Sequence, residues 1–203
     1  MNIYGASGHA KVIIDIAKSI DIPIDTIFDD NHKLIEVSGQ MIVHTISNKL
    51  LKGGTVLAIG NNRIRKIVAE KFEGKFQIGI FHSSAVLAPT VILGEGTVVM
   101  ANASINAEAV IGNHCIINTG ATVEHECQLG NYVHISPNSG LAGDVVVGEG
   151  THIGIGAVVI PGVKIGKWVT IGAGAVILED IPDFAVVVGN PGKIIKYNHL
   201  ENE

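Results

Sequence analysis

The sequence predicts an α/β plus all-β fold: a small Rossmann-like α/β domain over residues 1–82, a parallel β-helix over residues 83–182, and a capping tail over residues 183–203. Three observations lead to this prediction. Apolar segments of strand and helix character alternate before residue 82, and the apolar pattern takes a period of six after it. Glycine makes up 25 of the 203 residues, while aromatic residues account for only 4%. A core of small aliphatic side chains with many glycines indicates narrow, regular layers.

The first part alternates between strands and helices. Residues 3–4, 24–28 and 55–59 are expected strands, because each is a short apolar run that ends at Gly, Asp or Asn. Residues 10–20 and 62–72 place their apolar side chains at helical spacing. Strands that alternate with helices imply a parallel sheet covered on its faces. Such sheets bind ligands at the carboxyl ends of their strands.

The second part repeats every six residues. An aliphatic side chain stands at every sixth position from Ile105 to Ile177, and the residue four positions after each is almost always small or β-branched. Val86, Ile92 and Val98 show the same period one residue out of phase, so we expect a one-residue slip before Ile105. Each hexad is expected to form a short strand and a corner, and three hexads complete one triangular coil.

The tail leaves this pattern after Pro182. Residues 186–193 are expected to form a last strand and a turn that cap the open end of the helix, with residues 198–203 frayed.

Composition excludes several classes of protein. A net charge of −5 argues against sequence-independent binding of nucleic acid. Two cysteines, Cys115 and Cys127, do not make a disulfide framework, and Cys127 occupies a small-residue position where it should point inward and be unreactive. No signal-like segment opens the chain and no apolar run is long enough to cross a bilayer, so we expect a cytoplasmic protein without membrane insertion.

The loop Gly5-Ala6-Ser7-Gly8-His9 lies between an expected strand and an expected helix. Backbone N–H groups and a helix N-terminus in that place can hold an anion such as a diphosphate. The loop contains only a Gly-x-x-Gly step, which disfavours NAD. Asp29 and Asp30 follow about twenty residues later, where an acid can contact ribose. A helix N-cap at Ser7 and a simple turn at Asp29-Asp30 are the alternatives.

Five motifs occur together along the chain: Tyr4-Gly-Ala-Ser-Gly-His9, Phe28-Asp-Asp30, Ala58-Ile-Gly-Asn-Asn62, Glu124-His-Glu-Cys127 and Gly189-Asn-Pro-Gly-Lys193. In this order, and over essentially the whole chain, they resemble the NeuD/PglD-type sugar acetyltransferases of the hexapeptide-repeat superfamily. Among these the resemblance is closest to the UDP-4-amino-sugar N-acetyltransferases. It implies a left-handed β-helix, acetyl-CoA as cosubstrate, no metal, and a homotrimer with its sites at subunit interfaces.

The resemblance also implies an activity. We expect direct transfer of an acetyl group from acetyl-CoA to the amino group of a UDP-linked 4-amino-4,6-dideoxy sugar in bacterial surface-glycan biosynthesis. O-acetylation of sialic acid is the alternative within this class of enzymes. A non-catalytic β-helical binding protein is the alternative outside it.

His125, flanked by Glu124 and Glu126, is the catalytic candidate. A neutral imidazole can accept the proton of an amine that attacks a thioester, and a carboxylate on the other ring nitrogen orients it. The family pattern favours Glu126 for that role over Glu124. One coil of eighteen residues places Gly143 above His125, where its N–H can donate to the thioester oxygen. A solvated polar corner and a corner glycine are the alternative explanations.

Binding residues follow from the same resemblance. The nucleotide sugar is expected to contact Gly5, Ser7, Gly8, His9, Asp29, Asp30, Gly60, Asn61 and, in the acceptor pocket, Asn118. Acetyl-CoA is expected to contact His134 (across a subunit boundary), Gly143, Ile155, Gly156, Ala173, Gly174 and Lys193.

His134 and His152 are eighteen residues apart and should stack on one edge of the helix. A zinc site built from three histidines is the rival use of His114, His125, His134 and His152. These residues contain no His-x₄-His pair, so we expect no metal.

Overall fold

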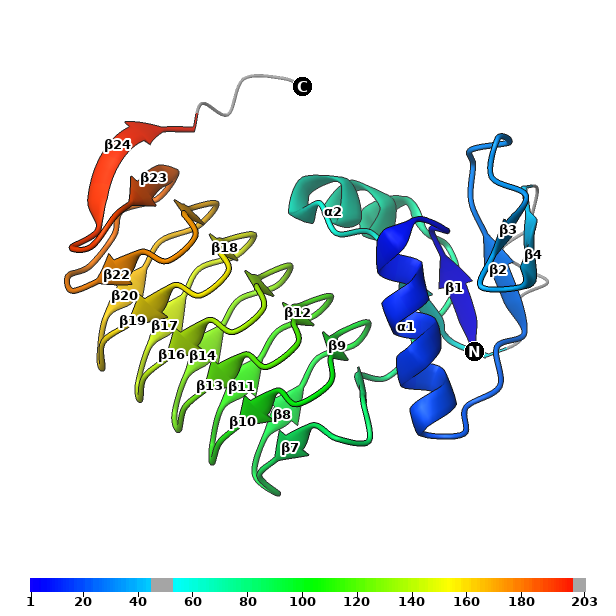
Figure 1. Cartoon of the computed structure of the whole chain (residues 1–203), viewed down its shortest axis with the longest axis horizontal. Coiled ribbons are helices and arrows are strands. Elements are labelled where there is room, and N and C mark those ends of the chain that lie inside the picture. The colour runs from blue at the N-terminus through cyan, green and yellow to red at the C-terminus, as the bar shows by residue number, and fades with distance from the viewer. Residues whose placement is uncertain (45–52, 199–203) are drawn as a thin grey trace.

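The computed structural model describes residues 1–44 and 53–198, and the predicted fold class is confirmed (Figure 1). An α/β domain lies beside the first coils of a long parallel β-helix, with helix α2 at the junction. The elements of the α/β domain are β1 (Asn2–Tyr4), α1 (Gly8–Ser19), β2 (Thr26–Phe28), β3 (Glu36–Val37), β4 (Gln40–Val43), β5 (Thr55–Leu57) and α2 (Asn62–Lys71).

The sheet of the α/β domain has the order β3-β4-β2-β1-β5. Its pairs β1–β2, β1–β5 and β2–β4 are parallel, as predicted, whereas β3 and β4 form an antiparallel hairpin that was not predicted. Ser38 and Gly39 connect the hairpin with φ values of 49° and 77°. Two residues at positive φ are the signature of the tight turn that suits a twisted hairpin.

Three flat faces make up the β-helix, and each is a ladder of short strands. The first face contains β7 (Val86–Leu87), β10 (Ser104–Ile105), β13 (Thr122–Val123), β16 (Gly140–Leu141), β19 (Val158–Val159) and β22 (Val176–Ile177). The second face contains β8 (Ile92–Leu93), β11 (Val110–Ile111), β14 (Gln128–Leu129), β17 (Val146–Val147) and β20 (Lys164–Ile165). The third face contains β6 (Ile80–Phe81), β9 (Val98–Val99), β12 (Ile116–Ile117), β15 (His134–Ile135), β18 (His152–Ile153), β21 (Thr170–Ile171), β23 (Ala185–Val188) and β24 (Lys193–Tyr197).

Successive coils are in register at eighteen residues, as the hexads predict. Ile105 pairs with Val123, and the second residue of each two-residue strand from β7 to β22 points into a continuous aliphatic core. The predicted one-residue slip is wrong. Leu87 pairs directly with Ile105 and packs against the core, whereas Val86 is 66% exposed on the outside.

Val98 departs from the expected pattern for a different reason. It is buried, but on the outer side of the third face, where Met100 and Ile116 join it in the core of the α/β domain. Its neighbour Val99 is the residue that faces the helix interior. The two hydrophobic cores thus lie on opposite sides of the same strands.

A left-handed backbone conformation occurs once in every corner from Gly96 to Gly174, at intervals of six residues. Glycine fills several of these positions without strain, which explains part of the high glycine content. Others carry Asn, Asp or larger side chains, including Glu126 at a φ of 61°.

At the far end, β23 adds in parallel to β21, and the chain then reverses into β24, which pairs antiparallel with β23. The predicted last strand and turn are present, and β24 is an addition to them. The third face already begins with β6, ahead of the predicted boundary at residue 82. The boundaries at 82 and 182 remain predictions.

Of the helices in residues 1–44 and 53–198, none has the length and apolar character needed to cross a membrane.

Arg65 joins the two parts of the molecule. This α2 side chain is 1% exposed and donates hydrogen bonds to main-chain carbonyls on both sides of the junction. Its Nε binds the carbonyl of His114 at 2.8 Å and an Nη binds that of Tyr132 at 2.9 Å, both in corners of the β-helix. The other Nη reaches Ile59 at 2.8 Å and Gly60 at 3.2 Å. Burial lowers the pKa of Arg65 to about 10, which leaves the guanidinium charged at neutral pH.

We expect Arg65→Ala to lower the free energy of unfolding by about 3–5 kcal/mol, because it leaves several buried carbonyls without donors. Arg65→Lys should recover little of this, since one ammonium cannot reach acceptors on three segments. Urea unfolding measures both effects. Arg63→Ala is the control on the same helix, because that guanidinium only lies over the Trp168 ring, at 5.9 Å. Equal losses for the Arg65 and Arg63 variants would contradict the assignment.

Candidate active site

His125 lies in the corner between β13 and β14, on the edge that joins the first and second faces. Its Nδ1 is 2.9 Å from Oε2 of Glu126, and both side chains are more than half exposed. With the Nδ1–H donated to this carboxylate, Nε2 is free to accept a proton. The left-handed backbone of Glu126 places the carboxylate beside its neighbouring ring. Glu126, and not Glu124, is thus the carboxylate that contacts His125.

Gly143 lies one coil beyond His125, as the spacing predicts. A Cβ built on Gly143 would be 2.5 Å from Cε1 of the His125 ring, so the imidazole lies directly against the glycine backbone. Glycine is required here because a side chain would overlap the His125 ring. The backbone conformation is not the reason, since φ at Gly143 lies outside the left-handed region. A bare peptide unit next to an imidazole matches the arrangement expected for a base and an oxyanion donor.

The third face carries a ladder of histidines. His134 and His152 stack with ring centroids 4.8 Å apart and planes within 3°, as predicted. Nε2 of His134 is 3.0 Å from Nδ2 of Asn118, and the Gly60 backbone hydrogen-bonds the same ring. Nε2 of His152 is 2.7 Å from Oγ of Ser136. The structure therefore brings Asn118, His134 and Gly60 together, although they come from both parts of the chain.

Burial keeps this ladder neutral. Burial, and after it the nearby His152, Arg65 and His9, lowers the pKa of His134 to about 3. Desolvation also lowers the pKa of His9 to about 4, with a smaller effect of Arg65. Nε2 of His9 is buried and has no hydrogen-bond partner among the described residues. These rings can donate or accept hydrogen bonds near pH 7, because their lowered pKa values keep them neutral there.

The predicted diphosphate loop is held by the neighbouring strands. Gly5 has a φ of 101°, and a Cβ there would lie 2.9 Å from the Ala58 carbonyl, so glycine is required. The Ala6 N–H donates to Oδ2 of Asp29 at 2.8 Å, and the Asn31 N–H donates to Oδ1 at 2.8 Å. Asp29 therefore joins two loops, which supports the turn alternative for this residue.

Other predicted residues of this region have mixed roles. The Tyr4 hydroxyl donates to Asp30, and burial together with this bond raises the Tyr4 pKa. Ser7 occupies the N-cap of α1 without a capping side-chain bond, whereas the Asn61 Oδ1 caps α2 by accepting from Ile64 N at 3.0 Å. Gly8 and Gly60 have open space where a Cβ would be, so a ligand can approach their backbone.

Four of the predicted acetyl-CoA residues, Ile155, Gly156, Ala173 and Gly174, lie in corners on the edge between the third and first faces. Gly174 N donates to the Ile155 carbonyl at 2.8 Å, which places the corners of adjacent coils side by side. A Cβ on Gly156 or Gly174 would meet nothing within 4 Å, and Ile155 is 53% exposed. Lys193 is exposed at the start of β24. This edge is open and made of small residues.

One chain does not assemble all of these parts. His125 and Gly143 lie on the edge between the first and second faces, whereas His134 projects from the third face and Asn118 lies on the edge between the third and first.

Cys115 and Cys127 are buried in the core, and burial raises the pKa of both thiols, to about 11 for Cys115. Within residues 1–44 and 53–198, no three His, Cys, Asp or Glu side chains lie close enough to hold a metal ion.

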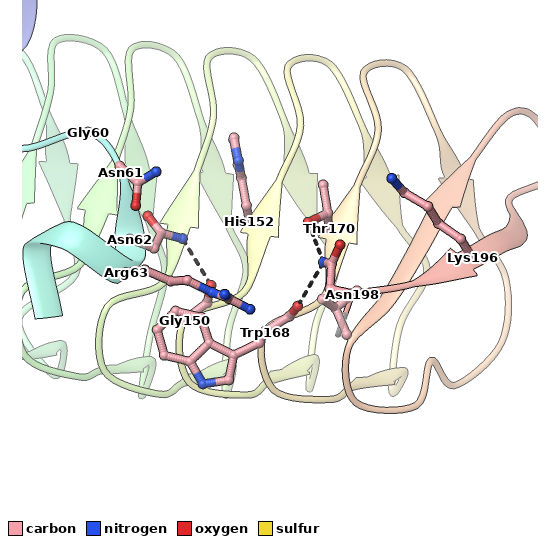
Figure 2. A pocket seen from close by; sticks show the side chains of 11 residues that line it. Gly60, Asn61, Asn62, Arg63, Gly150, His152, Trp168, Thr170, Lys196 and Asn198 are labelled. Atoms are coloured by element: carbon pink, nitrogen blue, oxygen red, sulfur yellow. Dashed lines mark hydrogen bonds between the residues drawn. The ribbon is translucent and has the colours of Figure 1, made fainter. Parts of the chain in front are cut away.

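A groove of about 700 Å³ extends from the histidine ladder, and sequence reasoning missed most of its lining (Figure 2). Of its residues, only Gly60, Asn61 and His152 are among the candidate ligand or metal contacts that the sequence predicts. The others are Asn62, Arg63, Gly150, Trp168, Val169, Thr170, Lys196 and Asn198. They come from three segments that are distant in the sequence. The one feature of the sequence that could have indicated the groove is the bulky Trp168, which occupies a left-handed corner.

Comparisons with known proteins agree with the predicted resemblance. Residues 1–72 match the PglD N-terminal domain, and the bacterial transferase hexapeptide model matches residues 90–125, 108–143 and 144–179. The structure of PerB from Caulobacter crescentus, in complex with CoA and GDP-perosamine, is 40% identical, covers 96% of both chains and has a TM-score of 0.90. The chain belongs to the PglD-type sugar acetyltransferases.

Other members of this family support the assignment. The acetyltransferase domain of PglB from Neisseria gonorrhoeae is 36% identical, with 96% of this chain and 98% of that chain covered and a TM-score of 0.88. A curated relative, UDP-N-acetylbacillosamine N-acetyltransferase of Bacillus subtilis, is 41% identical over 108 residues, which cover 49% of this chain. The chain spans half the length or less of the curated relatives it matches.

Stability should fall in mild acid because His9 and His134 are buried as neutral rings. The native pKa values of about 4 and 3 lie below the unfolded value of 6.5, so the unfolded chain binds more protons as pH falls below 6.5. The free energy of unfolding should then decrease by roughly 1.4 kcal/mol per pH unit for each ring, until pH approaches about 4. Urea unfolding at pH 7.5 and 5.5 measures the loss.

His134→Gln should remove its own share of this pH dependence, about 1.4 kcal/mol per pH unit, whereas His32→Gln, at an exposed position, should leave the slope unchanged. A free energy of unfolding that does not change between the two pH values would contradict the neutral buried rings.

Proposed function

We propose that the protein is an acetyl-CoA-dependent N-acetyltransferase that acts on the amino group of a nucleotide-linked aminosugar. The observation that carries this proposal is the contact of His125 with both Glu126 and the bare backbone of Gly143. The relatives add support, since one was solved with CoA and GDP-perosamine and another is named for UDP-N-acetylbacillosamine. The finer proposal is a UDP-linked 4-amino-4,6-dideoxy sugar on a route to a bacterial surface glycan.

In this mechanism His125 is the general base. Its Nε2 takes the proton from the sugar amine as the nitrogen attacks the thioester carbonyl, and Glu126 stabilises the imidazolium through Nδ1. The Gly143 N–H donates to the oxygen that becomes negative in the tetrahedral intermediate. When that intermediate collapses, the C–S bond breaks and the imidazolium returns a proton to the departing sulfur. Transfer is direct, and both buried cysteines stay outside the reaction.

A homotrimer completes the site in this proposal. The His125 edge of one subunit would meet the edge of Asn118 and Gly156 on the next, with the third face and its His134 beside it. An apolar strip along the first face supports this contact, with Val158 43%, Ile160 39% and Leu178 51% exposed. Flat faces of identical chains associate by rotation about a common axis, which closes the assembly.

His125→Ala should lower the rate of acetyl transfer about 10²-fold or more without changing the oligomer, because it removes the base. His134→Ala should also lower the rate, as the neutral ring positions the substrates.

A panel of UDP-4-aminosugars, CMP-sialic acid and free sialic acid with acetyl-CoA identifies the acceptor. Turnover on sialic acid alone would favour O-acetylation, and no turnover would favour a binding protein.

The two variants also test the shared site. Co-expressed His125→Ala and His134→Ala chains should assemble sites with both residues intact, at about a quarter of the total for random mixing in a trimer. Activity in the mixture well above that of either variant alone is the expected result. A mixture no more active than its components would contradict the shared site.

Gly143→Ala should reduce turnover with little loss of stability. The added Cβ would overlap the His125 ring, and that exposed ring can rotate away at small cost, which removes it from the reaction geometry. Kinetics and urea unfolding measure the two effects. Asp144→Asn is the control, because the exposed neighbour keeps a residue that tolerates its left-handed backbone. An active Gly143→Ala variant would contradict the role of this contact.

A further inference from the structure

The groove beside the histidine ladder has walls from three separate segments (Figure 2). The first turn of α2 supplies Arg63, the end of the chain supplies Lys196 on β24, and the outer third face forms the floor with His152 and Thr170. Its volume of about 700 Å³ is within the range of small-molecule sites, which is roughly 300–1,000 Å³. The groove is therefore large enough for part of a nucleotide-sized ligand.

Hydrogen bonds hold both walls to the floor. Asn62 Nδ2 donates to the Gly150 carbonyl at 3.0 Å, and Asn198 Nδ2 reaches Oγ1 of Thr170 at 3.3 Å. Arg63 lies over the Trp168 ring at 5.9 Å from its centre. A groove whose walls are fixed in this way is preorganised for a ligand.

The charge in the groove is positive and unpaired. Arg63 and Lys196 are its charged residues, no carboxylate lines it, and His152 is kept neutral because burial lowers its pKa. In the described part of the chain neither cation forms an ion pair, whereas the adjacent Lys66 binds Glu149 at 2.6 Å. Two unpaired cations in a chain of net charge −5 favour an anionic ligand at this place.

We propose that this groove binds the phosphate groups of a substrate, with Arg63 and Lys196 as the contacting cations. Figure 2 shows the two side chains entering from opposite ends, with His152 and Thr170 between them. His152 stacks on His134, so a ligand held here extends toward the proposed acceptor site. This inference rests on the proposed function, which gives two sources of phosphate. They are the diphosphate of the nucleotide sugar and the phosphates of CoA.

Binding measurements on the whole protein test this inference. Calorimetry with UDP and, separately, with CoA should show a Kd about tenfold weaker for Arg63→Gln and for Lys196→Gln with at least one ligand, because each loses a charge-assisted contact. The ligand whose Kd weakens identifies the source of the phosphate. Trp168 is the single tryptophan of the chain and lines the groove, so that ligand should also change its fluorescence.

Lys164→Gln is the matched control, because it removes a positive charge from the exposed second face without touching the groove. Its Kd values should equal those of the unaltered protein. In the transfer assay, the Arg63 and Lys196 variants should raise KM for the same substrate and leave kcat nearly unchanged, as expected for residues that bind but do not react.

The inference is overturned if both variants bind UDP and CoA as tightly as the control. That result leaves the proposed function intact when the protein still transfers acetyl groups. Conversely, weakened phosphate binding without turnover of any acceptor would support the groove and reject the transferase. Circular dichroism of each variant excludes loss of folding as the cause.

Discussion

The eighteen-residue backbone register of the β-helix determines where every proposed reactive group lies. Because each strand pairs with the strand one coil later, side chains at equal positions in successive coils must stack. This places the His125 ring on Gly143 and the ring of His134 on that of His152. The proposed catalytic contact between His125 and Gly143 therefore arises from main-chain hydrogen bonds alone, without any loop that has to fold around the site.

Docking of the α/β domain adds a second level of organisation. Arg65 fixes the loop at Gly60 against the third face, and that loop contacts the His134 ring. Burial keeps this ring neutral, although the Gly60 backbone itself acts in the opposite direction, while His125 on another edge stays exposed. Identical side chains thus have different surroundings, and in the proposed mechanism the exposed ring is the base whereas the buried, neutral ring positions a ligand.

The repeat and the stacked pairs could be predicted from sequence because a period of six is a direct consequence of the backbone geometry. The phase was harder to predict at the first coils. Val86 and Ile92 are aliphatic although they face outward, and Val98 is buried by the other domain, so hydrophobicity alone did not distinguish inside from outside there. The β3–β4 hairpin was missed because its two strands are short, although the Ser38-Gly39 turn indicated it.

Residues that act between distant segments were not predictable. Arg65 has the sequence context of an ordinary exposed helix residue, and its burial depends on corners about 50 and 67 residues away. Arg63 and Lys196 likewise belong to one groove only because α2 and β24 lie against the same face. Local sequence carries no information about contacts between such distant residues, since these contacts depend on how the two folded parts dock.

The docking by Arg65 has an evolutionary consequence. Its partners on the β-helix are peptide oxygens, which every amino acid supplies, so the side chains at positions 114 and 132 can drift without loss of these bonds. An α/β domain attached in this manner is interchangeable in principle. Under the proposed function, exchanging this domain on the same β-helix would change the nucleotide-sugar acceptor, while the acyl-transfer geometry of the coils stays the same.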